Sequence, residues 1–184
     1  MDCFKERKEK RERKEHRYEK MAMNKYLLII TLNTNGLNAP MKRHRTHEWI
    51  RKHDPHIGFL QEKHLRTKDL HRLKVKGWKQ IFQAKGQGKK AGVAVLISDK
   101  IDFKRRAIKR DPEGHFIILT GRIHQEDTNI VNMYAPNIEA PKYIKKILED
   151  FKKDIDSNTI IVGDFKTPLS KWTDLPNKIS TKIL

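Results

Sequence analysis

Residues 160–167 read IIVGDFKT. An apolar, mostly β-branched run stops at Gly163, and the carboxylate of Asp164 follows at once. Such a run is typical of a strand buried within a sheet, which presents its first charged group at its carboxyl end. Ligand sites in α/β proteins gather outside the carboxyl ends of strands. The stretch therefore predicts a buried strand that carries a metal ligand or catalytic acid, with Lys166 two residues further along.

Three other apolar runs also end on polar side chains. They are LLIITLN (27–33), which ends at Asn33, IGFLQE (57–62), which ends at Glu62, and IVNMYAPN (130–137), which carries Tyr134 and Asn137. One such run would mean little, because strand ends meet solvent in any case. Four of them bring an amide, two carboxylates and a phenol, and Mg²⁺ binds through one or two carboxylates plus substrate phosphate. The pattern favours a hard-metal site and, in a basic protein, a phosphodiesterase.

The chain is strongly basic, with 184 residues and a net charge of +18. Nucleic acid is the favoured partner, because neutralised phosphates dominate such binding. A membrane surface is less favoured, since the sequence lacks an amphipathic basic helix and a run long enough to span a bilayer. Excess charge that only keeps the protein in solution is the alternative. Cys3 is the only cysteine, which excludes an internal disulfide and favours a reducing, intracellular location, nuclear or cytoplasmic.

The chain divides into three parts by composition. Residues 1–24 form a mixed-charge leader that is expected to be disordered or a frayed helix, 25–170 form the globular domain, and 171–184 form a divergent tail. The patterns predict strands at 27–33, 57–62, 77–84, 91–98, 103–111, 115–123, 128–135 and 159–165, and helices at 41–54 and 141–156. Strands dominate, which favours an α/β sandwich over an alternating βαβ fold.

A series of short motifs carries a family resemblance. They are LNTNGLN (32–38), QEKH (61–64), KKAGVAVLIS (89–98), MYAPN (133–137) and GDFKTPLS (163–170). In this order and spacing they resemble the endonuclease/exonuclease/phosphatase family, most of all the apurinic-type endonuclease domain of mammalian LINE-type (non-LTR) retrotransposons. The resemblance implies a four-layered α/β sandwich of two mostly antiparallel sheets with flanking helices. It also implies a Mg²⁺-dependent nuclease that nicks one DNA strand to prime reverse transcription.

The same resemblance implies roles for the residues at the strand ends. Glu62 is the metal ligand, with Asn33 beside it in the metal site. Tyr134 contacts the scissile phosphate, Asn137 supports the site or contacts DNA, and Asp164 orients or deprotonates the attacking water and lies against the metal. Residues expected to contact DNA, with RNA as a second candidate, are Arg43, Arg45, Lys89, Lys90 and Lys166, with further charge from 104–110. Trp78 and Phe82 are interpreted as sheet core rather than as base-stacking side chains.

Two positions depart from the family pattern. The family has Asp-Phe-Asn where this chain has Asp164-Phe165-Lys166. A lysine there adds positive charge beside the metal and could pair with Asp164; two charges about 4 Å apart interact by roughly 4 kcal/mol at an effective dielectric constant of about 20. Lys63 replaces the threonine that usually follows the metal-binding glutamate. Strand alternation is expected to point it away from Glu62, which would make this change the milder one.

The family's Ser-Asp-His motif, which supplies the general base, does not occur in these residues. We therefore expect an incomplete sandwich with an exposed apolar sheet face, and impaired cleavage, because losing a general base costs about 10²–10⁴-fold in rate. Three interpretations stay open: an active endonuclease, a nucleic-acid-binding remnant without cleavage, and a truncated retroelement reading frame without a selected role. His64, His71, His115 and His124 are expected at the surface and not as substitutes for the base.

Overall fold

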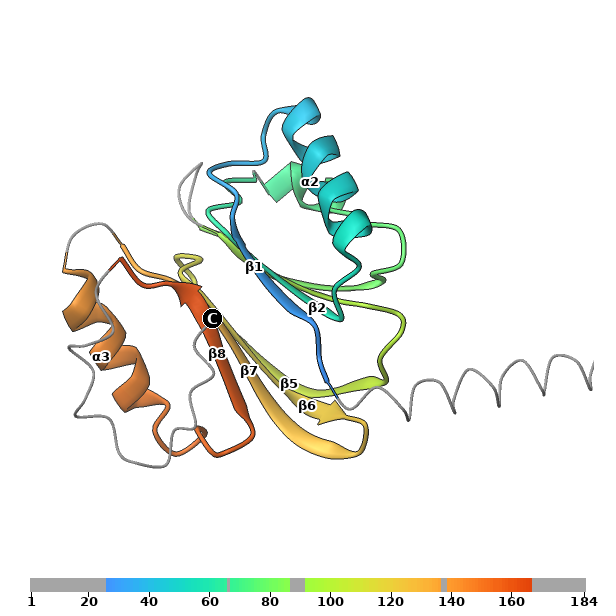
Figure 1. The fold of residues 1–184 in the computed structure, drawn as a ribbon. Coiled ribbons are helices and arrows are strands. Elements are labelled where there is room, and N and C mark those ends of the chain that lie inside the picture. The colour runs from blue at the N-terminus through green and yellow to red at the C-terminus, as the bar shows by residue number, and fades with distance from the viewer. Residues whose placement is uncertain (1–25, 66, 87–91, 137–138, 167–184) are drawn as a thin grey trace, which may run out of the picture.

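The computed structural model describes residues 26–65, 67–86, 92–136 and 139–166. Within these ranges two four-stranded sheets pack face to face, and each carries a helix on its outer face (Figure 1). Helix α2 (Pro40–His53) covers the first sheet and helix α3 (Ala140–Asp150) covers the second. This order of layers confirms the predicted four-layered α/β sandwich. The leader at 1–24 and the tail at 171–184 lie outside the described residues.

The first sheet has the strand order β1-β2-β4-β3. Its strands are β1 (Ile29–Asn33), β2 (Ile57–Gln61), β4 (Val93–Ile97) and β3 (Gln80–Ala84). Strand β1 runs parallel to β2, with α2 as the crossover that a parallel pair requires, and the other pairs are antiparallel. Asn33 is in register with Gln61. The carboxyl ends of β1 and β2 therefore lie side by side.

The second sheet has the order β5-β6-β7-β8. Its strands are β5 (Phe103–Arg110), β6 (Phe116–Ile123), β7 (Glu126–Tyr134) and β8 (Thr159–Asp164). Here too one pair is parallel: β7 and β8 are joined through α3, and Tyr134 is in register with Asp164. The other pairs are antiparallel, as predicted for most of the fold. Each sheet thus brings two strand ends with polar side chains to one place.

The core between the sheets contradicts one expectation. Phe59 and Val95 of the first sheet pack with Leu119 and Val162 of the second, and all four side chains are fully buried. Fully burying an apolar side chain of this size stabilises a fold by about 1.5–3 kcal/mol. The prediction that the inner face of the first sheet is exposed is therefore wrong for the described residues. The reason is that residues 103–164 already supply a four-stranded sheet that covers it.

The helices differ slightly from their predicted bounds. The apolar spacing predicts a helix over 141–156, but α3 ends at Asp150 and a turn follows. Phe151 and Ile155 continue the apolar face and pack in the same cluster as Ile144, without helical backbone. A 3₁₀ helix, η1 (Thr67–Arg72), lies between β2 and β3. No helix within the described ranges is long and apolar enough to cross a membrane.

Candidate functional site

The predicted site residues at the four strand ends come together. Asn33 ends β1, Glu62 follows β2, Tyr134 ends β7 and Asp164 ends β8. The two parallel pairs lie against each other, because β1 contacts β8 and β2 contacts β7. The Asn33 amide nitrogen Nδ2 donates a hydrogen bond of 2.8 Å to Asp164 Oδ2, which joins the two sheets at the site. Topology and register therefore build the cluster that the sequence patterns predict.

Lys166 lies in the middle of this cluster. Its ammonium nitrogen Nζ donates to Glu62 Oε1 at 3.2 Å and to the Tyr134 hydroxyl at 2.9 Å. It also lies 4.5 Å from the centroid of the Tyr134 ring, within range of a cation–π interaction. Only 26% of the Lys166 side chain and 13% of the Glu62 side chain are exposed, so solvent screens this pair less than it screens a surface ion pair. The sequence suggested Asp164 as the partner of Lys166, and the structure pairs it with Glu62.

The protonation states in the cluster follow from these contacts. Burial raises the pKa of Glu62, but hydrogen bonds with Asn33, Tyr134 and Lys166 outweigh it and bring the pKa below its ordinary value. Burial lowers the pKa of Lys166, and its contacts with Tyr134 and Glu62 more than reverse that effect. The pKa of Tyr134 is raised, mainly by burial. At neutral pH the site holds a carboxylate, an ammonium and a neutral phenol.

The backbone at both partners of the ion pair is left-handed. Glu62 has φ of 50° and Lys166 has φ of 49°. For residues other than glycine this conformation costs roughly 1–2 kcal/mol each. Such strain persists where the surroundings impose it, and it clusters at functional sites. Both residues lie beyond the ends of their strands, and the left-handed backbone takes their side chains out of the strand alternation, which lets Lys166 reach Glu62.

Lys63 directly follows the left-handed residue Glu62. Strand β2 ends at Gln61, so strand alternation does not extend to Lys63, and its side chain is fully buried. Its Nζ has no hydrogen-bond partner within the described part of the chain. The side chain lies over Gly92, where an added Cβ would come within 3.1 Å of Lys63 Nζ. Burial lowers the pKa of Lys63 to about 8. That Lys63 is the milder departure for the site stays a prediction, and the structure adds that Lys63 places in the interior an amine without a hydrogen-bond partner among the described residues.

The residues predicted to contact nucleic acid fall into different places. Arg43 is buried, and its Nη1 donates to the carbonyl oxygens of Leu37 at 2.8 Å and Asn38 at 2.7 Å. This burial counts against Arg43 as a phosphate contact and gives it a role in holding the loop before α2. Arg45 is exposed on α2. Lys89, Lys90 and Asn137 lie outside the described residues.

The resemblance implies Mg²⁺ at this cluster. Carboxylate and amide oxygens are of the type that Mg²⁺ takes. Glu62 Oε1, however, already pairs with an ammonium, and the amide oxygen Oδ1 of Asn33 accepts the Asn35 N–H at 2.9 Å. Among the described residues no group of three or more His, Cys, Asp or Glu could hold a metal ion. As arranged, the cluster does not fit a divalent ion, because a side-chain cation already binds Glu62.

Two supporting features escaped the sequence patterns. His115 stacks beside Tyr134, with ring centroids 6.2 Å apart and planes 11° apart, and its carbonyl oxygen accepts the Tyr134 N–H at 2.7 Å. Only 17% of its side chain is exposed, so His115 is not the surface residue that was expected. Gln61 and Asn132 form a buried polar contact between the sheets. Neither feature has a sequence signal, because each depends on which strands become neighbours.

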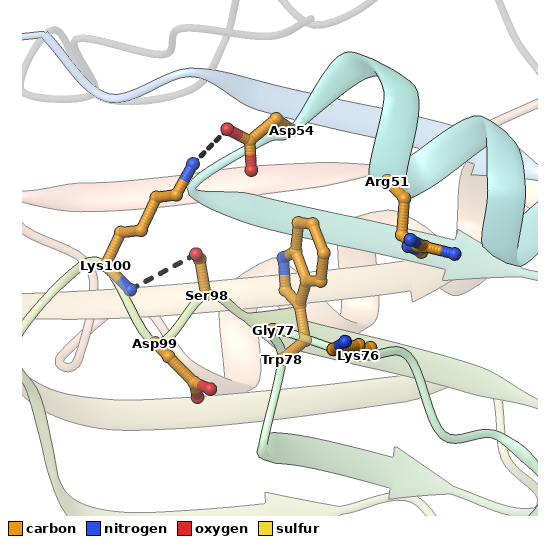
Figure 2. Close-up of a pocket in the computed structure, with 8 residues that line it drawn as sticks. All are labelled: Arg51, Asp54, Lys76, Gly77, Trp78, Ser98, Asp99 and Lys100. Atoms are coloured by element: carbon orange, nitrogen blue, oxygen red, sulfur yellow. Dashed lines mark hydrogen bonds and ion pairs between the residues drawn. The ribbon is translucent and has the colours of Figure 1, made fainter.

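A separate cavity of about 400 Å³ lies at the opposite end of the first sheet. Figure 2 shows Asp54 and Lys100 joined by an ion pair at its rim, with Trp78 beside them. The Trp78 indole is 4% exposed and donates to the Pro55 carbonyl oxygen at 3.2 Å, which confirms it as core. Ser98, which also lines the cavity, follows the end of β4 that pairs with the start of β2. The cavity is therefore remote from Glu62.

Comparison with known proteins agrees with this architecture. A family model described as the Endonuclease/Exonuclease/phosphatase family matches residues 30–176. The transposon TX1 uncharacterized 149 kDa protein of Xenopus laevis is 30% identical over 158 residues, which cover 83% of this chain and 12% of that protein. The chain thus spans a small part of this curated relative.

Solved structures share the fold at low sequence identity. The crystal structure of D. rerio TDP2 complexed with single strand DNA product superposes with a TM-score of 0.62 at 15% identity, covering 82% of this chain and 66% of that one. An AP endonuclease from Archaeoglobus fulgidus gives 0.55 at 17% identity, covering 77% and 58%. The sandwich, the cluster at its strand ends and the match over most of the sequence lead to one conclusion: the chain belongs to the endonuclease/exonuclease/phosphatase family.

Proposed function

We propose that this chain is a retrotransposon-type nuclease domain that binds the DNA backbone and cleaves it poorly or not at all. The observation that carries the proposal is the contact of Lys166 Nζ with Glu62 Oε1 at 3.2 Å and with the Tyr134 hydroxyl at 2.9 Å. The resemblance assigns those two partners to the metal and to the scissile phosphate. One ammonium engages both of them.

The impairment follows from what phosphodiester hydrolysis requires. Negative charge develops on the phosphate in the transition state, and a divalent ion stabilises it and activates water. In this chain the carboxylate that would bind such an ion is neutralised by Lys166. A single ammonium already paired with a carboxylate stabilises developing charge less than a divalent ion does. Removing it from Glu62 would also break its contacts with Tyr134.

Binding to DNA is supported by the basic surface of the described residues. Strand β5 is an edge strand, and most of its side chains are exposed. Its exposed basic residues are Lys104, Arg105, Arg106, Lys109 and Arg110. Arg45 adds charge on α2, and Lys42 lies near the site, with its Nζ bonded to the Asn35 carbonyl oxygen at 2.7 Å. Dispersed cations of this kind favour a polyanion that they can neutralise together. The fold neighbour TDP2 with its bound single-strand DNA product supports the same class of partner.

Two assays test the proposal. The first follows conversion of supercoiled plasmid to the nicked form with Mg²⁺, for the native chain and for Glu62→Ala. We expect no nicking above background from either protein. Metal-dependent nicking by the native chain that disappears in Glu62→Ala overturns the claim of impaired cleavage.

The second assay follows the binding of a fluorescent duplex DNA across a salt series. We expect affinity to fall steeply and linearly on a logarithmic salt scale, because each neutralised phosphate releases counterions. Absence of binding at low salt overturns the claim that the chain binds the DNA backbone.

A further inference from the structure

The Lys166 side chain is held in place by contacts of three kinds. It forms an ion pair with Glu62, a hydrogen bond with the Tyr134 hydroxyl and a cation–π contact with the Tyr134 ring. Lys166 lies two residues beyond the end of β8 and has a left-handed backbone, and its side chain reaches back to Glu62 and Tyr134. An ammonium with this set of partners is a fixed part of the cluster.

The charge balance of the cluster depends on this ammonium. Glu62 and Asp164 each bring a carboxylate to the strand ends, and Asn33 contacts Asp164 with its amide nitrogen. A phosphate diester that approaches two carboxylates without a cation meets like charge. Lys166 neutralises Glu62, and 26% of its side chain remains exposed. The remaining charge, on Asp164, faces the Asn33 amide, and Lys166 is the cation that these residues offer to an incoming phosphate oxygen.

We infer that Lys166 is the resident cation of this site, which receives a DNA phosphate diester without a divalent metal ion. The inference rests on the proposed function for the identity of the ligand. A divalent ion would have to displace the ammonium from Glu62 and break its contact with Tyr134. Lys166 and Mg²⁺ are thus alternative occupants of one carboxylate.

The first test measures DNA binding with and without metal. Fluorescence anisotropy of a labelled duplex is recorded in EDTA and in Mg²⁺ at matched ionic strength, because binding depends on salt. We expect the Kd of the native chain to change by less than about twofold between the two conditions. In Lys166→Asn we expect binding in EDTA to weaken by about tenfold, a loss of about 1.4 kcal/mol, and to recover in Mg²⁺.

Two variants serve as controls. Lys166→Arg keeps the charge, and its Kd for DNA should be the same in EDTA and in Mg²⁺, as we expect for the native chain. Lys146→Asn removes an exposed lysine from α3, in the outer layer of the sandwich, and should have a small effect that metal does not alter. Tighter binding of the native chain in Mg²⁺ than in EDTA overturns the inference, and this measurement requires no variant.

The second test needs no DNA. The melting temperature is followed while Mg²⁺ is added, since a ligand that binds the folded state raises it. We expect Mg²⁺ to leave the melting temperature of the native chain unchanged and to raise that of Lys166→Asn. The rise should be absent from the double variant Lys166→Asn/Glu62→Gln. A rise in the native chain as large as that in Lys166→Asn overturns the inference. Absence of DNA binding would overturn the proposed function, and this metal titration would still test the role of Lys166 separately.

Discussion

The side chain of Gln61 donates a hydrogen bond of 2.7 Å from its Nε2 to Oδ1 of Asn132, across the interior between the two sheets. The Asn132 nitrogen Nδ2 in turn donates to the carbonyl oxygens of Leu60 at 3.1 Å and Ala94 at 2.8 Å. Gln61 is 1% exposed and Asn132 is fully buried. Within an otherwise apolar layer, these bonds fix how one sheet docks on the other.

This contact also sets the geometry of the site. Gln61 directly precedes Glu62, and Asn132 lies two residues before Tyr134 on β7. The hydrogen bond between Gln61 and Asn132 therefore holds Glu62 and Tyr134 within reach of Lys166. The interior network and the ion pair above it are therefore parts of one arrangement.

Replacing Asn132 by alanine should lower the free energy of unfolding by about 3 kcal/mol, because it leaves the buried Gln61 amide and two carbonyl oxygens without this partner. Urea denaturation measures the change. Asn129→Ala is the matched control on the same strand, where the side chain donates to the Asp154 carbonyl oxygen nearer the surface. We expect it to cost about 1 kcal/mol or less. Equal losses of unfolding free energy in the two variants would show that the buried inter-sheet hydrogen bonds stabilise the fold no more than the bond nearer the surface.

Gly163→Ala should destabilise the protein by about 3 kcal/mol, because overpacking a close backbone contact forces strands apart. A Cβ at position 163 would lie 2.2 Å from the Met133 carbonyl oxygen on the neighbouring strand. Gly58→Ala in β2 is the control, since its nearest contact would be an ordinary 3.7 Å to Leu96 Cβ. Thermal melting of both variants checks the contrast. Similar melting temperatures would mean that β7 and β8 can shift apart enough to accommodate the added Cβ at little cost.

Lys63→Met should stabilise the protein at neutral pH, because it removes a buried amine that has no hydrogen-bond partner in the described residues. The pKa of Lys63 falls from 10.5 to about 8 on folding. Below pH 8 the amine is charged in both states and its full burial cost, on the order of 3 kcal/mol, opposes folding.

The same shift gives a pH dependence with a definite sign. Between about pH 8 and 10.5 the unfolded chain binds the Lys63 proton and the folded chain does not, so stability rises with pH. Chemical denaturation at several pH values should show this rise in the native chain and a weaker one in Lys63→Met. A pH profile that Lys63→Met leaves unchanged would contradict the assignment.

Substitution by methionine should lower the stability of the fold at Arg43 and weaken DNA binding at Arg45. Arg43→Met loses two hydrogen bonds to the carbonyl oxygens of Leu37 and Asn38, and stability should fall by about 2 kcal/mol. Arg45→Met should leave stability within about 0.5 kcal/mol, because its side chain is exposed. It should instead weaken DNA binding and reduce its salt dependence. Urea denaturation and anisotropy, run on both variants, separate the two effects.

The sequence predicts much of this architecture, because each strand and the polar residue at its end are encoded by neighbouring residues in the chain. Runs such as LLIIT and IIVG are long enough and apolar enough to specify buried strands, and the polar residue that ends each run is fixed by the chain itself. Asn33, Glu62, Tyr134 and Asp164 were therefore predicted as a group, and the structure brings them together.

The contacts that the sequence did not predict are made by long side chains whose partners come from other segments or from loops. Strand alternation predicts orientation only as far as the strand extends, and β2 ends before Lys63. The partner of Lys166 depends on two left-handed residues, which no propensity requires of glutamate or lysine. Arg43 has a helical position that is typical of a surface contact, and only the path of the preceding loop places two carbonyl oxygens beside it.

The hydrogen bond between Asn33 and Asp164 joins residues 131 positions apart in the chain. Contacts of such high sequence separation must overcome the entropy of closing a long loop, and they slow folding relative to local ones. The first sheet is complete by Ile97, but Asp164 belongs to the last strand of the second. The cluster of Asn33, Glu62, Tyr134 and Asp164 can therefore assemble only when both halves of the chain have docked, and its formation is a kinetic marker of the fully folded domain.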